Sequence, residues 1–296
     1  MLTLEGTYTA IVTPFAADES IDWKAFDALV DAQIAGGVSG LVPCGTTGES
    51  PALSEEEQLA VIKRTVARAA GRVPVIAGTG SNSTRHAIHL SKAAEAAGAD
   101  GVMVVVPYYN KPTQEGLFRH FTAVAAAVKC PVMIYNIPGR TGIDLSADTL
   151  VRICEASPNV IATKEATGNV LRAQELVRRL GQRLTVLCGD DALTLPMVAI
   201  GARGVVSVTS NLLPKEVSEA TRAALQGDNE KARRLHLALV PVHEIMFVEA
   251  NPGPVKAAMA KRGMLADVVR GPLSSATEPS RKRLWETLDR YEGRAP

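Results

Sequence analysis

The chain lacks the sequence features that mark secreted, membrane-spanning and metal-stapled proteins. Its cysteines show neither the Cys-x-x-Cys spacing of zinc and redox sites nor the density of a disulfide scaffold; the four are Cys44, Cys130, Cys154 and Cys188. We expect reduced thiols in the core. The N-terminus has no signal-peptide pattern, and no apolar run approaches the ~20 residues of a membrane span. These features predict a cytoplasmic protein with no membrane partner.

An excess of one charge and an abundance of aromatic residues are also missing. Lys and Arg total 32 against 31 Asp and Glu, and both signs alternate along the chain. This pattern offers no basic surface for nucleic acid. Aromatic residues make up only 4% of the chain, which argues against a surface for base stacking. We therefore expect no nucleic-acid partner.

Short apolar runs rich in β-branched residues alternate with segments of helical periodicity along the whole first part of the chain. This alternation is typical of successive βα units that build a parallel sheet. The eight runs cover residues 7–12, 40–42, 73–77, 101–106, 131–135, 160–163, 184–188 and 204–208. The length of 296 residues is compatible with one large α/β barrel, since such barrels commonly reach ~250 residues.

The clearest helices are expected at residues 54–70, 83–97 and 114–128. The first opens with Ser54-Glu-Glu-Glu57, a capping box, and Gly98 and Gly181 stand where helix C-caps belong. Eight strands, each followed by a helix, fit a (β/α)₈ TIM barrel better than a doubly wound sheet. After Gly227 the pattern changes to helices alone. We therefore expect a TIM-barrel catalytic domain at residues 1–227 and a C-terminal helical region at 228–296.

Lys164 is a candidate functional residue because it directly follows the apolar run 160–163. Functional groups of such barrels lie at the C-terminal ends of strands. Most lysines near strand ends merely pair with an acid or extend to solvent. A nucleophilic lysine needs its pKa lowered from ~10.4, and the mouth of a barrel supplies the necessary desolvation. An amine placed there can form a Schiff base with a ketone.

Three other strand ends carry polar groups. The second run leads into Pro43-Cys-Gly-Thr-Thr-Gly-Glu49, whose hydroxyls and N–H groups can converge on a carboxylate, although an ordinary tight turn is equally compatible. The fourth run ends in Pro107-Tyr-Tyr-Asn110, and the fifth leads through Tyr135 to Arg140. Three of the five tyrosines thus lie at strand ends, an uneven distribution, even though single tyrosines are more often packing residues.

Five segments carry a family resemblance through their residues, order and spacing: Gly45-Thr-Thr-Gly-Glu49, Tyr108-Tyr-Asn110, Tyr135-Asn-Ile-Pro138, Lys164-Glu-Ala-Thr-Gly-Asn169 and Gly189-Asp-Asp191. With them the chain resembles, over nearly its whole length, the dihydrodipicolinate synthase and N-acetylneuraminate lyase family of class I aldolases and lyases. The resemblance implies that Lys164 forms a Schiff base with pyruvate and that Tyr135 relays protons there. Thr46 would complete this relay together with Tyr109 from a neighbouring subunit.

The resemblance also implies how the substrates are bound. Thr46 and Thr47 would hold the pyruvate carboxylate, and the main chain near Gly189 and Val206 would line the pocket. The segment Gly139-Arg-Thr-Gly142 resembles the pattern of the synthase branch of the family, in which the arginine binds the carboxylate of aspartate semialdehyde. Arg140 suits that task because a guanidinium can bind a carboxylate through two hydrogen bonds.

The activity that the resemblance implies is condensation of pyruvate with aspartate semialdehyde in lysine and diaminopimelate biosynthesis. No metal or organic cofactor is expected, since the iminium on the lysine is itself the electron sink. A homotetramer built from two tight dimers is expected by the same resemblance. Two alternatives stay open: a pyruvate-dependent aldolase acting on a sugar acid or another aldehyde, and a non-catalytic barrel that binds a small acid.

Lysine-regulated members of the family have an allosteric pocket at the tight-dimer interface. The corresponding patch in this chain consists of Ser50, Glu55, Gln58, Asn82, His86 and Tyr108. Asn82 and Tyr108 match the regulated pattern. His86, however, stands where regulated bacterial members carry a glutamate, and Glu55 and Gln58 stand where histidines are expected. We therefore expect weak inhibition by L-lysine or none.

Three tempting motifs are incomplete. Gly78-Thr-Gly-Ser-Asn-Ser83 lacks the third glycine of a dinucleotide fingerprint. His243 begins a zinc-protease pattern, but Phe247 occupies the place of its second histidine. The pair Asp190-Asp191 has no third metal ligand at a convincing spacing, so a polar loop or helix N-cap is expected instead.

Overall fold

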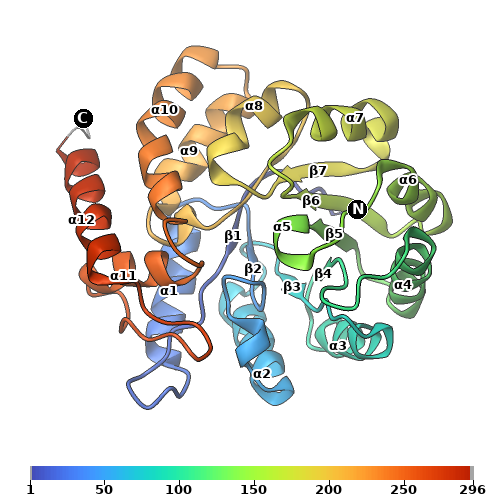
Figure 1. The fold of residues 1–296 in the computed structure, drawn as a ribbon, viewed down its shortest axis with the longest axis horizontal. Helices are drawn as coiled ribbons and strands as arrows, with labels where there is room; N and C mark the ends of the chain where they lie inside the picture. The colour runs from blue at the N-terminus through green and yellow to red at the C-terminus, as the bar shows by residue number, and fades with distance from the viewer. Residues whose placement is uncertain (1, 294–296) are drawn as a thin grey trace.

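The computed structural model describes residues 2–293, and its strands form a single parallel barrel (Figure 1). The strands are β1 (Gly6–Ala10), β2 (Gly40–Val42), β3 (Ile76–Gly78), β4 (Gly101–Val105), β5 (Val132–Asn136), β6 (Val160–Glu165), β7 (Thr185–Cys188) and β8 (Gly204–Ser207). They pair in the order β2-β1-β8-β7-β6-β5-β4-β3, and a parallel bridge between Leu41 and Val75 closes the ring. The predicted (β/α)₈ barrel is confirmed.

Helices lie around the strands in Figure 1. Those that belong to the βα units are α1 (Trp23–Ala35), α2 (Glu55–Ala69), α3 (Thr84–Ala96), α4 (Gln114–Ala127), α6 (Ala147–Ala156), α7 (Val170–Leu180), α8 (Thr194–Ala199) and α9 (Pro214–Leu225). The short helix α5 (Pro138–Thr141) and the 3₁₀ turns η1 (Ser50–Ala52), η2 (Gly181–Arg183), η3 (Asp191–Leu193) and η4 (Thr209–Asn211) occupy connecting loops. None of the helices between residues 2 and 293 combines the length and the apolar character that a membrane crossing requires.

The predicted element ends agree with the structure to within a few residues. Ser54 is the N-cap of α2 and forms the reciprocal capping box with Glu57. Gly181 caps α7, whereas Gly98 lies one residue beyond the cap of α3 and has a φ of 90°, which glycine adopts without strain. The sixth strand is longer than expected and ends at Glu165. Lys164 therefore lies inside the strand, where its side-chain direction is fixed by the pleat.

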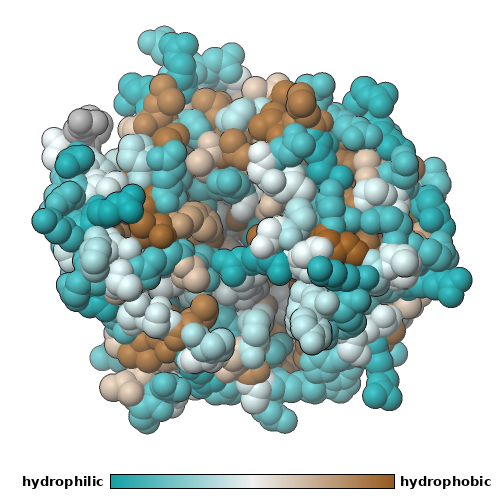
Figure 2. All heavy atoms as spheres, viewed as in Figure 1, coloured by the Kyte–Doolittle hydropathy of each residue, from teal (hydrophilic) through white to brown (hydrophobic). Residues whose placement is uncertain are grey.

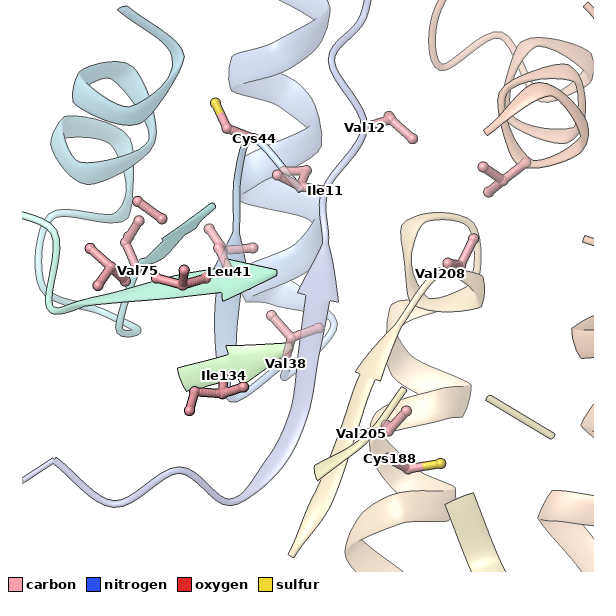
Figure 3. Close-up of a cluster of buried hydrophobic side chains, with 14 of the residues drawn as sticks. Ile11, Val12, Val38, Leu41, Cys44, Val75, Ile134, Cys188, Val205 and Val208 are labelled. Atoms are coloured by element: carbon pink, nitrogen blue, oxygen red, sulfur yellow. The ribbon is translucent and has the colours of Figure 1, made fainter. Parts of the chain in front are cut away.

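Alternation along the strands divides the apolar residues into two cores. The inner core fills the barrel with residues such as Tyr8, Met133 and Val206. The outer core lies between strands and helices, and Figure 3 shows part of it around Leu41 and Val205. Three of the four cysteines are buried and all four are free thiols.

The chain after the barrel is helical. It forms α10 (Asn229–Ile245), α11 (Gly253–Lys261) and α12 (Glu278–Glu292), with an irregular segment between the last two. Helix α10 packs against α9 and α12, and α11 packs against α12 and η4. Nearly every residue of α11 is buried. This part of the chain is thus packed onto the barrel over a large area.

Candidate active site

Lys164 and Tyr135 lie side by side on neighbouring strands and face the interior of the barrel. The register of β5 and β6 pairs the two residues, and the Lys164 Nζ atom lies 4.1 Å from the centre of the Tyr135 ring. Their exposed fractions are 5% and 4%. The most buried ion pairs of the described residues involve Lys256 and Arg172 rather than Lys164. The pair is therefore an amine and a phenol held together in a partly desolvated place.

The turn after β2 presents backbone donors. In the described part of the chain, the N–H groups of Thr46 and Thr47 have no hydrogen-bond acceptor. The turn is closed by Glu49 N–H, which donates to Thr46 O at 3.1 Å, and Thr13 Oγ1 donates to Gly48 O at 2.7 Å. Two free N–H groups next to a hydroxyl form a concave anion-binding site of the kind a carboxylate fits.

A glycine on β3 makes room for this turn. A Cβ atom on Gly78 would lie 2.2 Å from the carbonyl oxygen of Cys44 and 2.9 Å from Gly45 N. Any side chain at Gly78 would therefore push the turn away. The glycine that begins the dinucleotide-like segment is therefore explained by its packing against the turn after β2.

Arg140 lies on α5, in the loop after β5, with its side chain exposed. Its Nη2 atom donates a long hydrogen bond of 3.5 Å to the carbonyl of Asn251. Asn251 Nδ2 donates to Thr47 Oγ1 at 2.9 Å, and its Oδ1 atom is buried without a partner in the described residues. Asn251 therefore connects the two expected carboxylate-binding groups. Sequence reasoning missed it, because the only signal was a polar residue beside prolines after α10.

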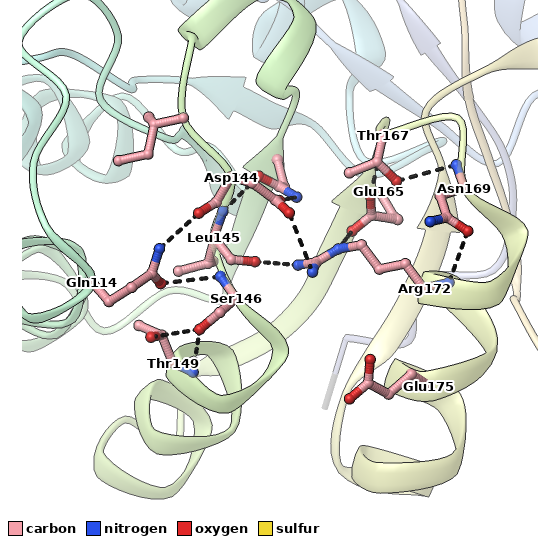
Figure 4. A network of polar contacts seen from close by, with 12 residues as sticks. Gln114, Asp144, Leu145, Ser146, Thr149, Glu165, Thr167, Asn169, Arg172 and Glu175 are labelled. Carbon is pink, nitrogen blue, oxygen red and sulfur yellow. Dashed lines mark hydrogen bonds and ion pairs between the residues drawn. The ribbon is translucent and has the colours of Figure 1, made fainter.

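A polar network holds the Arg140 loop against the strand of Lys164 (Figure 4). Asn136 Nδ2 donates to Asp144 Oδ1 at 2.7 Å, and Leu145 N donates to Asn136 Oδ1 at 3.2 Å. Arg172 Nε donates to Glu165 Oε2 at 3.0 Å, and the same guanidinium also binds Leu145 O. The loop that follows Tyr135 is thus fastened to the residue next to Lys164.

The ends of β7 and β8 complete the rim. Gly189 N donates to Glu165 O at 2.8 Å, and a Cβ on Gly189 would lie 2.5 Å from Ala166 Cβ. Val206 belongs to the inner core together with Tyr135. Asp190 is the N-cap of η3, as the sequence predicted. Among residues 2–293, no three His, Cys, Asp or Glu side chains are arranged as metal ligands.

A cavity of about 450 Å³ opens beside these groups, and the space-filling view is hollowed near its centre (Figure 2). Of the expected substrate-site residues, Thr46 and Arg140 line it, whereas Lys164 and Tyr135 do not. Four residues of the expected allosteric patch also line it: Ser50, Gln58, His86 and Tyr108. The cavity therefore runs from Thr46 in the turn after β2 to that patch.

Other predicted residues lie apart from this group. Tyr109 is 88% exposed and has a φ of 73°, and no hydrogen bond of the described residues joins its side chain to Lys164 or Tyr135. The carboxylate of Glu55 forms an ion pair with His89 and lies 4.0 Å from His86 Nδ1. The backbone carbonyl of Asn82 accepts from Asn110 Nδ2 at 2.8 Å.

The sequence and the fold match known proteins along nearly the whole chain. The model of the dihydrodipicolinate synthetase family matches residues 3–291. The 4-hydroxy-tetrahydrodipicolinate synthase of Sorangium cellulosum is 62% identical over 99% of this chain and 98% of its own. The structure of the chloride-inhibited dihydrodipicolinate synthase from Acinetobacter baumannii complexed with pyruvate is 44% identical, with a TM-score of 0.96 and coverage of 98% and 99%. The enzyme of Cyanidioschyzon merolae with lysine bound is 37% identical, with a TM-score of 0.94 and coverage of 97% and 98%.

Proposed function

This chain belongs to the dihydrodipicolinate synthetase family, and from this premise we propose that it is a 4-hydroxy-tetrahydrodipicolinate synthase, a lyase of the class I aldolase type. It condenses pyruvate with L-aspartate 4-semialdehyde in lysine and diaminopimelate biosynthesis. The observation that carries the proposal is the buried Lys164 amine 4.1 Å from the Tyr135 ring. The free N–H groups of the Thr46-Thr47 turn support it, because they suit the carboxylate of a 2-oxo acid.

In the proposed reaction, the Lys164 amine attacks the ketone of pyruvate and water leaves, which yields an iminium ion. Loss of a methyl proton gives an enamine, whose carbon attacks the aldehyde of aspartate semialdehyde. The α-amino group of that substrate then attacks the imine carbon, closes the ring and displaces Lys164. Tyr135 and Thr46 move the protons at these steps together with Tyr109 of a second subunit.

Substrate binding follows from the charges around the cavity. The turn of Thr46 and Thr47 would hold the pyruvate carboxylate, and the backbone near Gly189 and Val206 would line the pocket. Arg140 has an exposed guanidinium at the cavity and is free to bind the carboxylate of aspartate semialdehyde in a bidentate manner. This arginine favours the synthase over an aldolase for sugar acids, and the buried amine favours an enzyme over a non-catalytic binding barrel.

The proposal extends to assembly and location. We place the enzyme in the cytoplasm because its thiols are unpaired, which suits a reducing compartment. We also propose a homotetramer of two tight dimers. Tyr109, 88% exposed in one chain, then enters the site of the neighbouring subunit. Residues 1–227 would form the barrel and residues 228–296 the helical region. One substrate-binding site would require both parts.

Lys164→Ala should abolish turnover and the trapping of pyruvate by borohydride, because it removes the amine proposed to form the Schiff base. Lys164→Arg should fail equally, since a guanidinium stays protonated. Intact-mass analysis after reduction measures the adduct, and Lys261→Ala, on the exposed side of α11, is the control that should trap normally. Undiminished trapping in Lys164→Ala would disprove the assignment of the nucleophile.

Arg140→Ala should weaken the use of aspartate semialdehyde far more than that of pyruvate. The loss of a charged hydrogen-bonding partner costs about 2 to 4 kcal/mol, or roughly 30- to 1,000-fold in kcat/KM. Steady-state rates with each substrate varied in turn provide the measurement, with the exposed Arg119→Ala as control. Equal losses of kcat/KM for both substrates would contradict the proposed binding of aspartate semialdehyde by Arg140.

Tyr109→Phe should lower kcat by about tenfold or more without changing the oligomer, because only a proton-transferring hydroxyl is removed. Sedimentation at assay concentration should give a tetramer for both proteins. A wild-type monomer with full activity, or a variant with unchanged kcat, would refute the shared site.

L-Lysine should inhibit weakly, with half-inhibition above ~1 mM, a typical upper KM scale. His86 replaces an anionic acceptor in the patch, and Glu55 is already paired with His89. His86→Glu should increase the sensitivity by roughly ten- to hundredfold, which corresponds to about 1 to 3 kcal/mol. The measurement is the initial rate at increasing L-lysine concentration and fixed substrate concentrations. Strong inhibition of the wild type would contradict the prediction and show that the patch still binds L-lysine.

A further inference from the structure

A fully buried ion pair joins α11 to the turn that follows β2. The side chains of Lys256 and Glu49 are both 0% exposed, and Lys256 Nζ donates to Glu49 Oε1 at 2.5 Å. The same ammonium donates to Val268 O at 2.8 Å, and Arg270 N donates to Glu49 Oε2 at 2.9 Å. One carboxylate oxygen of Glu49 is thus held by Lys256 of α11, and the other by Arg270 in the segment between α11 and α12.

The aromatic ring of Phe15 completes this buried cluster. Lys256 Nζ lies 4.2 Å and Arg270 Cζ lies 4.4 Å from the centre of the ring, so both cations contact its π system. Arg270 is in turn paired with Glu57 on α2. Burial lowers the pKa of Lys256, and the nearby Glu49 carboxylate opposes that effect. The Glu49 carboxylate therefore stabilises the charged form of Lys256.

Stability alone does not account for such a pair. Removing two charges from water costs several kcal/mol for each ion, and apolar residues of similar volume are often as stabilising or more so. The pair also fixes the orientation of the Glu49 carboxylate, because a carboxylate with both oxygens hydrogen-bonded has one permitted orientation. Fixing the Glu49 side chain also fixes the backbone segment to which Glu49 belongs.

Glu49 is the last residue of the carboxylate-binding turn. It has a φ of 56°, in the left-handed region, and its N–H closes the turn on Thr46 O at 3.1 Å. Asn251 Nδ2 holds the neighbouring Thr47 Oγ1 at 2.9 Å. Residues 251, 256 and 270 therefore hold the turn at two separate points, although all three lie outside the eight βα units.

We propose that the Glu49–Lys256 pair, with the Arg270 backbone, is a positioning device that aims the Thr46 and Thr47 N–H groups at the carboxylate of the 2-oxo acid. The C-terminal helical region is then part of the substrate-binding machinery rather than an appendage. This inference rests on the proposed function. Neither Glu49 nor Lys256 touches the reacting atoms, so both act through the turn.

The test compares pyruvate with methyl pyruvate, which has the same ketone but no free carboxylate. The double variant Glu49→Leu/Lys256→Met removes both charges and keeps the volume; Glu49→Asp keeps the charge and shortens its reach. The concentration of ketone that gives half-maximal borohydride trapping on Lys164 is measured for each protein, together with Tm. The control pair is Lys261→Met/Asp289→Leu, a surface pair between α11 and α12.

Both Glu49 variants should need about tenfold or more pyruvate, while methyl pyruvate is trapped within about threefold of the wild type. The control pair should match the wild type with both ketones. Unchanged dependence on pyruvate in either folded variant, or equal losses for the two ketones, would overturn the positioning role. If Glu49→Leu/Lys256→Met does not fold, Glu49→Asp decides alone. A wild type that traps no pyruvate would instead overturn the proposed function.

Discussion

A parallel barrel admits only alternate residues of each strand to its interior, and this constraint governs the candidate site. Tyr135 and Lys164 are paired in register on β5 and β6, so one inward position on each strand places the phenol beside the amine. The inner core of apolar residues below them excludes water from that side. A shift of either strand by one residue would exchange these side chains for their outward neighbours.

Those outward neighbours have a structural task of their own. Asn136 follows Tyr135 and Glu165 follows Lys164, and both are anchors of the network with Asp144 and Arg172. Each of the two proposed catalytic side chains is therefore adjacent in sequence to a residue that anchors the loop after β5 through this network. In the dipeptides Tyr135-Asn136 and Lys164-Glu165, the first side chain faces the interior of the barrel and the second takes part in the network.

The sequence predicts the strands, the barrel and the residues at strand ends well, because these depend on local periodicity and on turns of recognisable composition. It did not reveal Asn251 or Lys256. Lys256 in the apolar helix α11 has no local sign of complete burial, since its partner Glu49 is 207 residues away in the chain. Tyr109 is 88% exposed in this chain, and the role proposed for it in the site of a second subunit cannot be inferred from the periodicity of one chain.

The long separation between Glu49 and its cationic partners has a consequence for biosynthesis. During translation the turn after β2 is made well before its partners, since Lys256 and Arg270 follow Glu49 by 207 and 221 residues. Until then the Glu49 carboxylate has neither partner and favours water over the interior. The Glu49 carboxylate can therefore be buried as an ion pair only after the chain has been made as far as α11 and Arg270. The ion pair thus makes the final form of the Thr46–Glu49 turn depend on synthesis of this later region.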